Sequence, residues 1–339
     1  MRFERGFSRT RARLVGAVLV ALILAAGVAA WSAHGGAQKP LTIGRGYEHD
    51  AGTVGDRIVA ASLLKTAGIK ATIKVLGSPQ NTVVALKRGD IELGAPGLNP
   101  ALQAMQQGGN FKIVLVTGAG PELVLVADGL GSAAALKGKK VGISPWDESK
   151  VFAEIVTARA GVKKGDVKYQ AVDESTNRAI ALVGGRLDAA VLEYVDYVRI
   201  KEKYPSVKLI SRAADVLPLT ARMLLVNEDY AQTQRERLQT IISNMIKGYE
   251  HLYTPAGRRE WIAYAKKTSL KGEPDSLVEQ VYGFYRGINM WPRRTSYPSK
   301  ARWDASMRFR VAHKLLEGSA PSYDRAFDLS FWKNAAKGG

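Results

Sequence analysis

A ten-residue pattern occurs twice in this chain of 339 residues and constrains its fold more than any other feature. The first copy spans residues 85–94 and reads ALKRGDIELG; the second spans residues 181–190 and reads ALVGGRLDAA. Each copy predicts an apolar helix that ends at a left-handed glycine and is followed within two residues by a short apolar strand. The repeat indicates two α/β lobes of like construction. Small molecules bind between such lobes, at the carboxyl ends of the strands.

The composition is that of a globular protein. Hydrophobic residues make up 46% of the chain, enough for a full core, and the length favours two domains or one bilobed unit. There is no cysteine, which excludes disulfides, thiolate chemistry and a lipidated cysteine anchor.

The amino terminus has the pattern of a leader. Residues 1–13 carry five arginines against one glutamate, and residues 14–30 contain only Leu, Val, Ala, Ile and Gly. A charged segment followed by an apolar one predicts a secretory signal peptide over residues 1–37. The alternative is an uncleaved membrane anchor through residues 14–30. In either case we expect the body of the chain in the periplasm, where nucleic acid is excluded as a partner.

The positive charge is concentrated in the carboxy-terminal third. Residues 201–339 hold 24 basic and 14 acidic side chains, whereas residues 38–200 hold 20 and 16. Such an excess fits either an anionic partner or the solvated faces of amphipathic helices.

Strand and helix patterns alternate from residue 41 to residue 227, which favours mostly parallel sheets with helices on both faces. The segment 222–227 resembles the segment 123–128, so the chain is expected to cross between the lobes near both. The predicted fold is α/β, with two Rossmann-like lobes, a double-crossover hinge and a helical carboxy-terminal region. Residues 38–122 and 222–339 would form lobe I, and residues 123–221 lobe II. Beyond residue 234 the apolar spacing is helical, and its aromatic residues are expected in the core.

Three predicted strand-to-helix turns contain Ser or Asn before proline, at Ser78, Asn99 and Ser144. Ser and Asn are preferred helix N-caps, and proline suits the first helical position. Helix amino termini at strand ends offer free N–H groups to an anionic or strongly polar ligand. The same turns are also explained by helix capping alone.

Further ligand candidates follow other predicted strands. The Trp and Tyr side chains among them offer flat apolar faces with a polar edge, the mixture that small-molecule pockets favour. They are Tyr47, His49, Trp146, Ser149, Glu193, Tyr194 and Thr220.

Sequence signatures of catalysis are absent. The glycines near residue 44 lack the third glycine of a dinucleotide fingerprint, and no phosphate-binding Gly-Lys-Ser/Thr loop occurs. The four histidines have no metal-ligand spacing. We therefore expect no catalytic residue, cofactor or metal.

From Leu41 to Tyr230 the chain resembles the periplasmic substrate-binding proteins of ABC importers, in the branch that handles sulfonates, taurine, nitrate and thiamine-pyrimidine precursors. The resemblance rests on LTIG at 41–44, GSPQN at 77–81, the first repeat, LKGKKVG at 136–142 and GRLDAA at 185–190. It implies a type II Venus-flytrap fold that closes on one ligand and docks on permease subunits in the inner membrane. It also implies that the turns at Tyr47, Ser78, Gln80, Asn99, 146–149 and 193–194 face the ligand.

Residues 145–148, PWDE, stand where many relatives have glycine and serine, which argues against a sulfonate or nitrate ligand. The expected ligand is small and polar, either anionic or heteroaromatic. The alternatives are a TRAP-type receptor, an enzyme similar to the thiamine-pyrimidine synthases, and a membrane-anchored sensor.

Overall fold

The computed structural model describes residues 39–46, 51–118, 120–145, 148–163, 165–217 and 222–337. The chain divides into a unit of residues 1–40 and a compact unit of residues 41–339, and the description below concerns the second. The predicted leader, residues 1–37, lies in the first unit and outside the described residues, which begin at residue 39. Among the described residues, no helix has both the length and the hydropathy of a membrane span.

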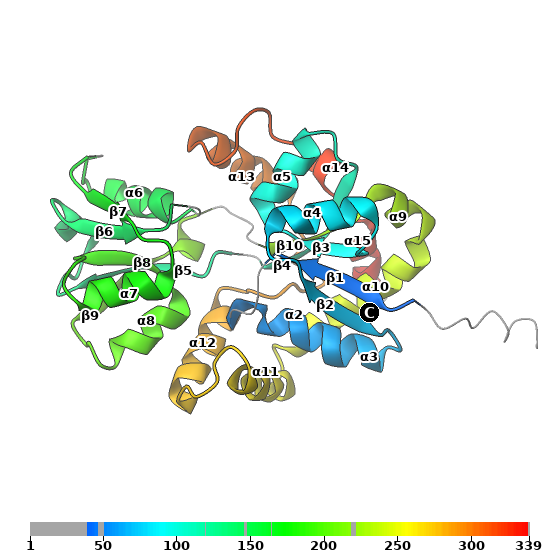
Figure 1. The fold of residues 1–339 in the computed structure, drawn as a ribbon, viewed down its shortest axis with the longest axis horizontal. Coiled ribbons are helices and arrows are strands. Elements are labelled where there is room, and N and C mark those ends of the chain that lie inside the picture. The colour runs from blue at the N-terminus through cyan, green and yellow to red at the C-terminus, as the bar shows by residue number, and fades with distance from the viewer. Residues whose placement is uncertain are drawn as a thin grey trace, which may run out of the picture. The chain divides into compact units, whose positions relative to one another are not determined.

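Sheet A has the strand order β2-β1-β3-β10-β4. Strands β1, β2 and β3 are parallel, and β10 runs antiparallel between β3 and β4. The strands are β1 (Leu41–Arg45), β2 (Ala71–Val75), β3 (Leu93–Ala95), β4 (Phe111–Gly118) and β10 (Arg222–Asn227), drawn in blue, cyan and yellow-green in Figure 1. The helices between them are η1 (Ala51–Thr53), α2 (Val54–Ile58), the π-helical η2 (Val59–Leu63), α3 (Leu64–Thr66), α4 (Pro79–Arg88) and α5 (Leu98–Gln106).

Sheet B repeats this plan with the order β7-β6-β8-β5-β9, in which β5 is the antiparallel strand. Its strands are β5 (Leu123–Asp128), β6 (Lys140–Ile143), β7 (Lys168–Ala171), β8 (Ala189–Glu193) and β9 (Val207–Arg212). Its helices are η3 (Ala133–Leu136), α6 (Ser149–Arg159), α7 (Ser175–Val183), α8 (Tyr194–Lys201) and η4 (Ala213–Asp215). The chain therefore passes from sheet A to sheet B after β4 and returns after β9, at the two predicted places.

The repeated pattern occupies equivalent positions in the two sheets. The first copy forms the end of α4 and strand β3, and the second forms the end of α7 and strand β8. Gly89 and Gly185 have φ angles of +76° and +67°, the left-handed conformation expected at a helix end. Two mixed α/β sheets of one topology confirm the predicted fold class.

The carboxy-terminal region is helical, as predicted. It comprises α9 (Glu228–Thr233), α10 (Arg235–His251), α11 (Pro255–Lys267), α12 (Asp275–Gly287), α13 (Lys300–Ala312), α14 (Tyr323–Ala326) and α15 (Ser330–Lys337). The apolar residues of α10 recur at helical spacing and are buried from Leu238 to Tyr249. Trp261, Trp291 and Trp303 are each at most 2% exposed, so these aromatic residues belong to the core, as expected.

Helices cover both faces of sheet B. Leu125 of β5 packs in a cluster with Phe152 of α6, whereas Val126 packs in a larger cluster that holds Leu182 of α7 and continues into sheet A. The alternation along β5 is the period of two expected of a strand buried on both faces. Because residues 41–339 form one compact unit, the predicted lobe boundaries stay a prediction.

Candidate functional site

The described candidate residues follow carboxyl ends of strands in both sheets. Ser78 and Gln80 follow β2, and Asn99 follows β3; Ser144 and Ser149 follow β6, and Glu193 and Tyr194 lie where β8 meets α8. Strand carboxyl ends are where open α/β sheets bind ligands. Tyr47, His49, Trp146 and Thr220 lie outside the described residues, so their placement stays a prediction.

Ser78 is the N-cap of α4, as predicted. Its hydroxyl accepts a hydrogen bond from the backbone N–H of Asn81 at 3.1 Å, and Pro79 occupies the first helical position. Gln80, in the first turn of the same helix, is exposed.

The prediction that Asn99 is an N-cap is wrong. Helix α5 begins at Leu98 with Gly97 as its N-cap, and Gly97 has a φ of +83°, which favours glycine. Pro100 fits inside the first turn because its position needs no intrahelical donor there. The Asn99 side chain instead accepts a hydrogen bond from Nη1 of Arg310 at 2.5 Å.

Ser144 is not an N-cap either, because α6 begins five residues later, at Ser149. The Ser149 hydroxyl accepts a hydrogen bond from the Ser144 backbone N–H at 2.8 Å and donates one to the Ser144 carbonyl at 3.2 Å. Both serines are buried. Ser149 therefore closes the loop between β6 and α6 and fixes where the helix begins.

Tyr194 lies against the carboxy-terminal region. Its ring stacks on Phe284 of α12 with centroids 3.8 Å apart and an interplanar angle of 6°. Burial raises the pKa of the Tyr194 hydroxyl above its ordinary value. Next to it, the Glu193 backbone N–H donates to the Ser175 hydroxyl at 2.9 Å. One face of the Tyr194 ring is thus covered by protein.

An ion pair joins the two places where the chain crosses between the sheets. Arg222, which begins β10, donates to the carboxylate of Glu122, one residue before β5. The Tyr285 hydroxyl donates to the other oxygen of this carboxylate at 2.5 Å. Both partners of the ion pair are largely buried, so the two crossings are held together by a charge-assisted contact.

A second polar cluster lies close to the first. Arg45, the last residue of β1, pairs with Asp56 of α2, and the Tyr249 hydroxyl donates to Asp56 at 2.8 Å. Burial, with the Asp56 charge as a further cause, raises the pKa of Tyr249 well above its ordinary value. A side chain added at Gly52 would collide with the guanidinium of Arg222, so the backbone of η1 passes directly over that charge.

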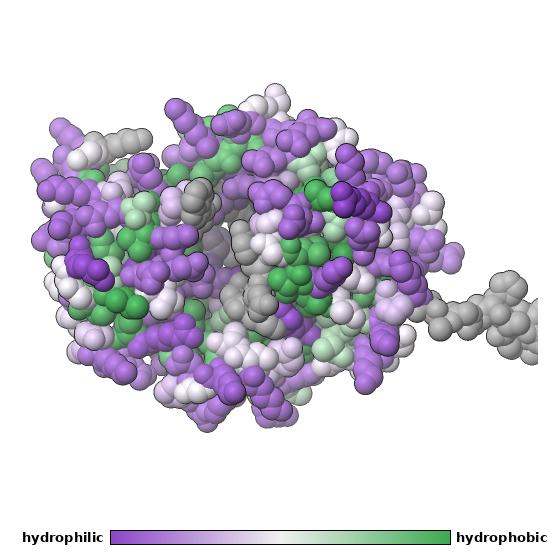
Figure 2. Space-filling view, in the orientation of Figure 1, coloured by the Kyte–Doolittle hydropathy of each residue, from purple (hydrophilic) through white to green (hydrophobic). Residues whose placement is uncertain are grey.

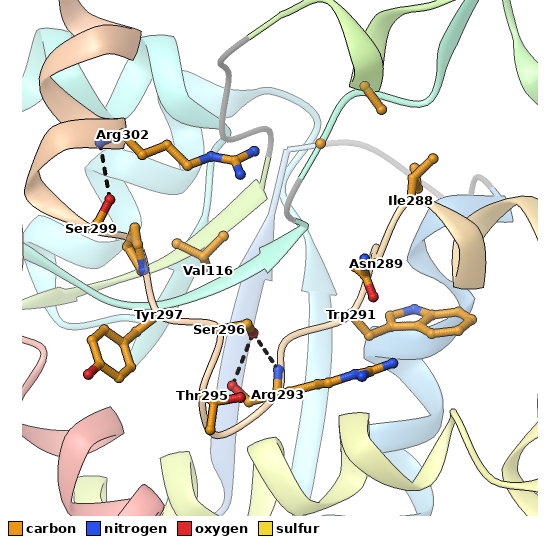
Figure 3. A pocket seen from close by; sticks show the side chains of 13 residues that line it. Val116, Ile288, Asn289, Trp291, Arg293, Thr295, Ser296, Tyr297, Ser299 and Arg302 are labelled. Carbon is orange, nitrogen blue, oxygen red and sulfur yellow. Dashed lines mark hydrogen bonds between the residues drawn. The ribbon is translucent and has the colours of Figure 1, made fainter.

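A pocket of about 560 Å³ opens at the carboxyl-end side of β4 and β9 (Figure 3). Val116 of β4, Gly120 of the first crossing and Ala214, just after β9, line one part of it. The segment between α12 and α13, together with Arg302 of α13, lines the rest. The described residues that line it include Arg293 and Arg302 and no acidic residue. An anionic group is favoured in such a pocket.

Local contacts order the polar wall of this pocket. The Ser296 hydroxyl accepts from the Arg293 backbone N–H at 2.7 Å, and the Ser299 hydroxyl caps α13 by accepting from the Arg302 N–H at 3.2 Å (Figure 3). The Arg293 guanidinium lies over the Tyr253 ring, 3.9 Å from its centroid. The pocket residues from Ile288 to Arg302 lie beyond Phe284, where no sequence pattern pointed to a site.

The described residues contain no group of three or more His, Asp or Glu side chains that could hold a metal ion. Hydrophilic residues cover much of the face shown in Figure 2.

Comparison with known proteins gives a family and a fold. The family model described as NMT1/THI5 like matches residues 60–256, more than half of the chain. A protein of Brucella abortus described as a binding protein is 29% identical over 152 residues, which are 44% of this chain and 47% of the relative. The chain thus spans about half the length of the curated relatives that it matches.

Solved structures of low sequence identity share the fold. The periplasmic sulfonate-binding protein SsuA from Methylobacillus flagellatus is 18% identical with a TM-score of 0.72, over 89% of this chain and 95% of that one. The alkanesulfonate-binding protein SsuA from Xanthomonas axonopodis, bound to MOPS, is 20% identical with a TM-score of 0.62, over 85% and 98%. These proteins have the type II periplasmic binding fold expected from the sequence.

Proposed function

The chain belongs to the NMT1/THI5-like family, and on that basis we propose that it is an extracytoplasmic solute-binding protein that delivers a small anionic ligand to an ABC permease. One observation carries the proposal. Two sheets of the same strand order are joined by two crossings, and a pocket with a basic lining opens beside the first crossing, between Val116 of sheet A and Ala214 of η4, which follows sheet B. Such a site can bind and release a solute through a change at the crossings, without chemistry.

The charge of the pocket lining supports an anionic ligand. Arg293 and Arg302 supply planar guanidinium donors, which suit sulfonate, phosphate and carboxylate groups. Trp291 and Tyr297, which also line the pocket, offer apolar surface to the rest of the ligand. The relatives described as sulfonate-binding make sulfonates the first class to test, although the 145–148 segment departs from the pattern of many relatives.

The test uses the purified chain from residue 38 onward. Its melting temperature and heat of binding are measured with taurine, MOPS, nitrate and a pyrimidine, and with choline as a cationic probe. At a ligand concentration about 100 times the Kd, binding raises the unfolding free energy by about 2.7 kcal/mol. We expect stabilisation by at least one anion and none by choline.

A matched pair of variants locates the site. Arg302→Gln removes a pocket charge, whereas Arg308→Gln removes an exposed charge from the same helix outside this pocket. We expect Arg302→Gln to weaken binding of the active anion about tenfold, which is about 1.4 kcal/mol. Equal effects of the two variants would reject the pocket, and stabilisation by no anion of the panel would reject the anionic ligand.

The proposed location outside the cytoplasm depends on residues 14–30, the apolar segment of the predicted leader. Mass spectrometry of the protein from a cell envelope fraction tests this: loss of the leader indicates a released periplasmic protein, and its retention indicates an anchor. Recovery of the intact chain from the cytoplasm alone would contradict export in either form.

A further inference from the structure

Helix α13 contacts elements of both sheets. Trp303 at its start packs edge to face on Phe327 at 4.9 Å between centroids, and Met307 lies in the cluster that holds the core of sheet A. Phe309, near its end, packs against the cluster on the α6 face of sheet B. The helix therefore forms a link between the sheets in addition to the two crossings.

Arg310 is a buried charged residue at this link. It is 1% exposed, and its guanidinium contacts one residue that follows a strand of each sheet. Nη1 donates to the side-chain oxygen of Asn99 in the first turn of α5, and Nη2 lies 3.0 Å from the carboxylate of Glu148, the residue before α6. Asn99 follows β3 of sheet A, and Glu148 follows β6 of sheet B.

The burial of this guanidinium is costly. Desolvation lowers the pKa of Arg310 from its ordinary value, against the opposing charge of Glu148. Its Nε, and the buried hydroxyl of Ser306 one turn earlier, have no hydrogen-bond partner among the described residues. A buried ion pair of this kind adds little net stability, and fixing one geometry is its best-supported use.

The two partners differ in access to water. The Glu148 side chain is 20% exposed, whereas that of Arg310 is 1% exposed. Glu148 can exchange the guanidinium for water while Arg310 stays fixed in α13. The contact can therefore break on the side of sheet B alone.

We propose that Arg310 acts as a positioning residue, a latch that holds Asn99 at the start of α5 to Glu148 before α6 and favours the close approach of the two sheets. Opening the molecule to release a solute then requires Glu148 to leave Arg310. This role goes beyond the proposed function and rests on it only for the solute, since the latch acts on Asn99 and Glu148 whether or not a solute is bound.

The test exploits the absence of cysteine from the chain. Exposed Asp90 and Arg186, which occupy equivalent positions of the repeat in the two sheets, are changed to cysteine and spin-labelled. Double electron–electron resonance then gives the distribution of distances between the labels without any ligand. The variants are Arg310→Met, which keeps the apolar stem, Arg310→Lys, which restores the charge, and Glu148→Gln. Arg308→Met, an exposed position on the same helix, is the control.

We expect Arg310→Met and Glu148→Gln to give distance distributions that are longer and broader than that of the control. The distribution of Arg310→Lys should lie between that of Arg310→Met and that of the control. If Arg310→Met does not fold, Glu148→Gln decides, because Glu148 is partly exposed and glutamine preserves its size. Distances unchanged in folded Glu148→Gln overturn the latch. Because no ligand enters this measurement, failure of the latch is distinct from failure to bind an anion.

Discussion

Glu92 and Asp188 make the same pair of hydrogen bonds in two different sheets. The Glu92 carboxylate accepts from the Thr42 backbone N–H at 2.7 Å, while its own backbone N–H donates to the Thr42 carbonyl at 3.1 Å. The Asp188 carboxylate accepts from the Lys140 N–H at 2.8 Å, and its N–H donates to the Lys140 carbonyl at 3.0 Å. The acidic position of the repeat therefore pins the neighbouring parallel strand, β1 in sheet A and β6 in sheet B.

Alanine at these two positions should destabilise the protein unequally. Glu92 is 7% exposed, and its loss leaves a partly buried N–H without its acceptor, at a cost of about 2 kcal/mol. Asp188 is half-buried, and water can replace its carboxylate at Lys140, so about 1 kcal/mol is expected. Urea unfolding of Glu92→Ala and Asp188→Ala gives both values. Equal losses would show that burial does not set the cost.

The two repeat glycines should resist substitution for a backbone reason alone. A Cβ at Gly89 or Gly185 would meet no atom within 4 Å, yet both residues have positive φ angles. Alanine in that conformation costs about 1 kcal/mol. Gly131→Ala is the control, because Gly131 has equally open surroundings and no such φ angle. The denaturant midpoints of unfolding should fall in Gly89→Ala and Gly185→Ala and stay unchanged in Gly131→Ala.

The repeat made the sheets predictable, whereas side-chain contacts over long separations did not follow from the sequence. The glycine and the acidic position of each copy are local signals, so they located α4, β3, α7 and β8 correctly. Asn99 failed as a cap because Gly97, whose positive φ favours glycine, is the N-cap of α5, and Ser144 failed because α6 begins only at Ser149. Arg310 contacts Asn99 over 211 positions of sequence, and no local pattern separates it from the other arginines of the basic third.

Loss of the Ser149 hydroxyl should cost more than loss of the Ser78 hydroxyl. Ser149→Ala leaves the buried Ser144 N–H without its acceptor, at about 2 kcal/mol. Ser78→Ala removes a cap from the surface, at about 1 kcal/mol. Chemical denaturation measures the free energy of unfolding of both variants. A larger loss of stability in Ser78→Ala would contradict the role assigned to Ser149 in closing the loop before α6.

Tyr249 should make stability fall at alkaline pH. Its pKa is raised in the folded state, chiefly by burial, so its contribution is complete below its unfolded pKa of about 10 and is lost as pH rises above that value. Tyr249→Phe removes the hydrogen bond to Asp56 and should lower stability by about 2 kcal/mol at pH 7. The difference between wild type and variant, measured by urea unfolding, should shrink toward about pH 11. A difference that grew with pH would reverse the assigned sign.

Tyr194 and Phe284 should couple energetically across sheet B and α12. A double-mutant cycle with Tyr194→Ala and Phe284→Ala should give an interaction energy of about 1 kcal/mol for rings stacked at 3.8 Å. Tyr194 and Tyr197, whose rings are 6.0 Å apart and tilted, provide a weaker reference pair. Tyr194→Phe separates packing from ligand contact, because it keeps the stacked ring and removes the hydroxyl. Retained stability with weaker binding of the active anion would place the hydroxyl at the ligand, and unchanged binding would leave Tyr194 a packing residue against α12.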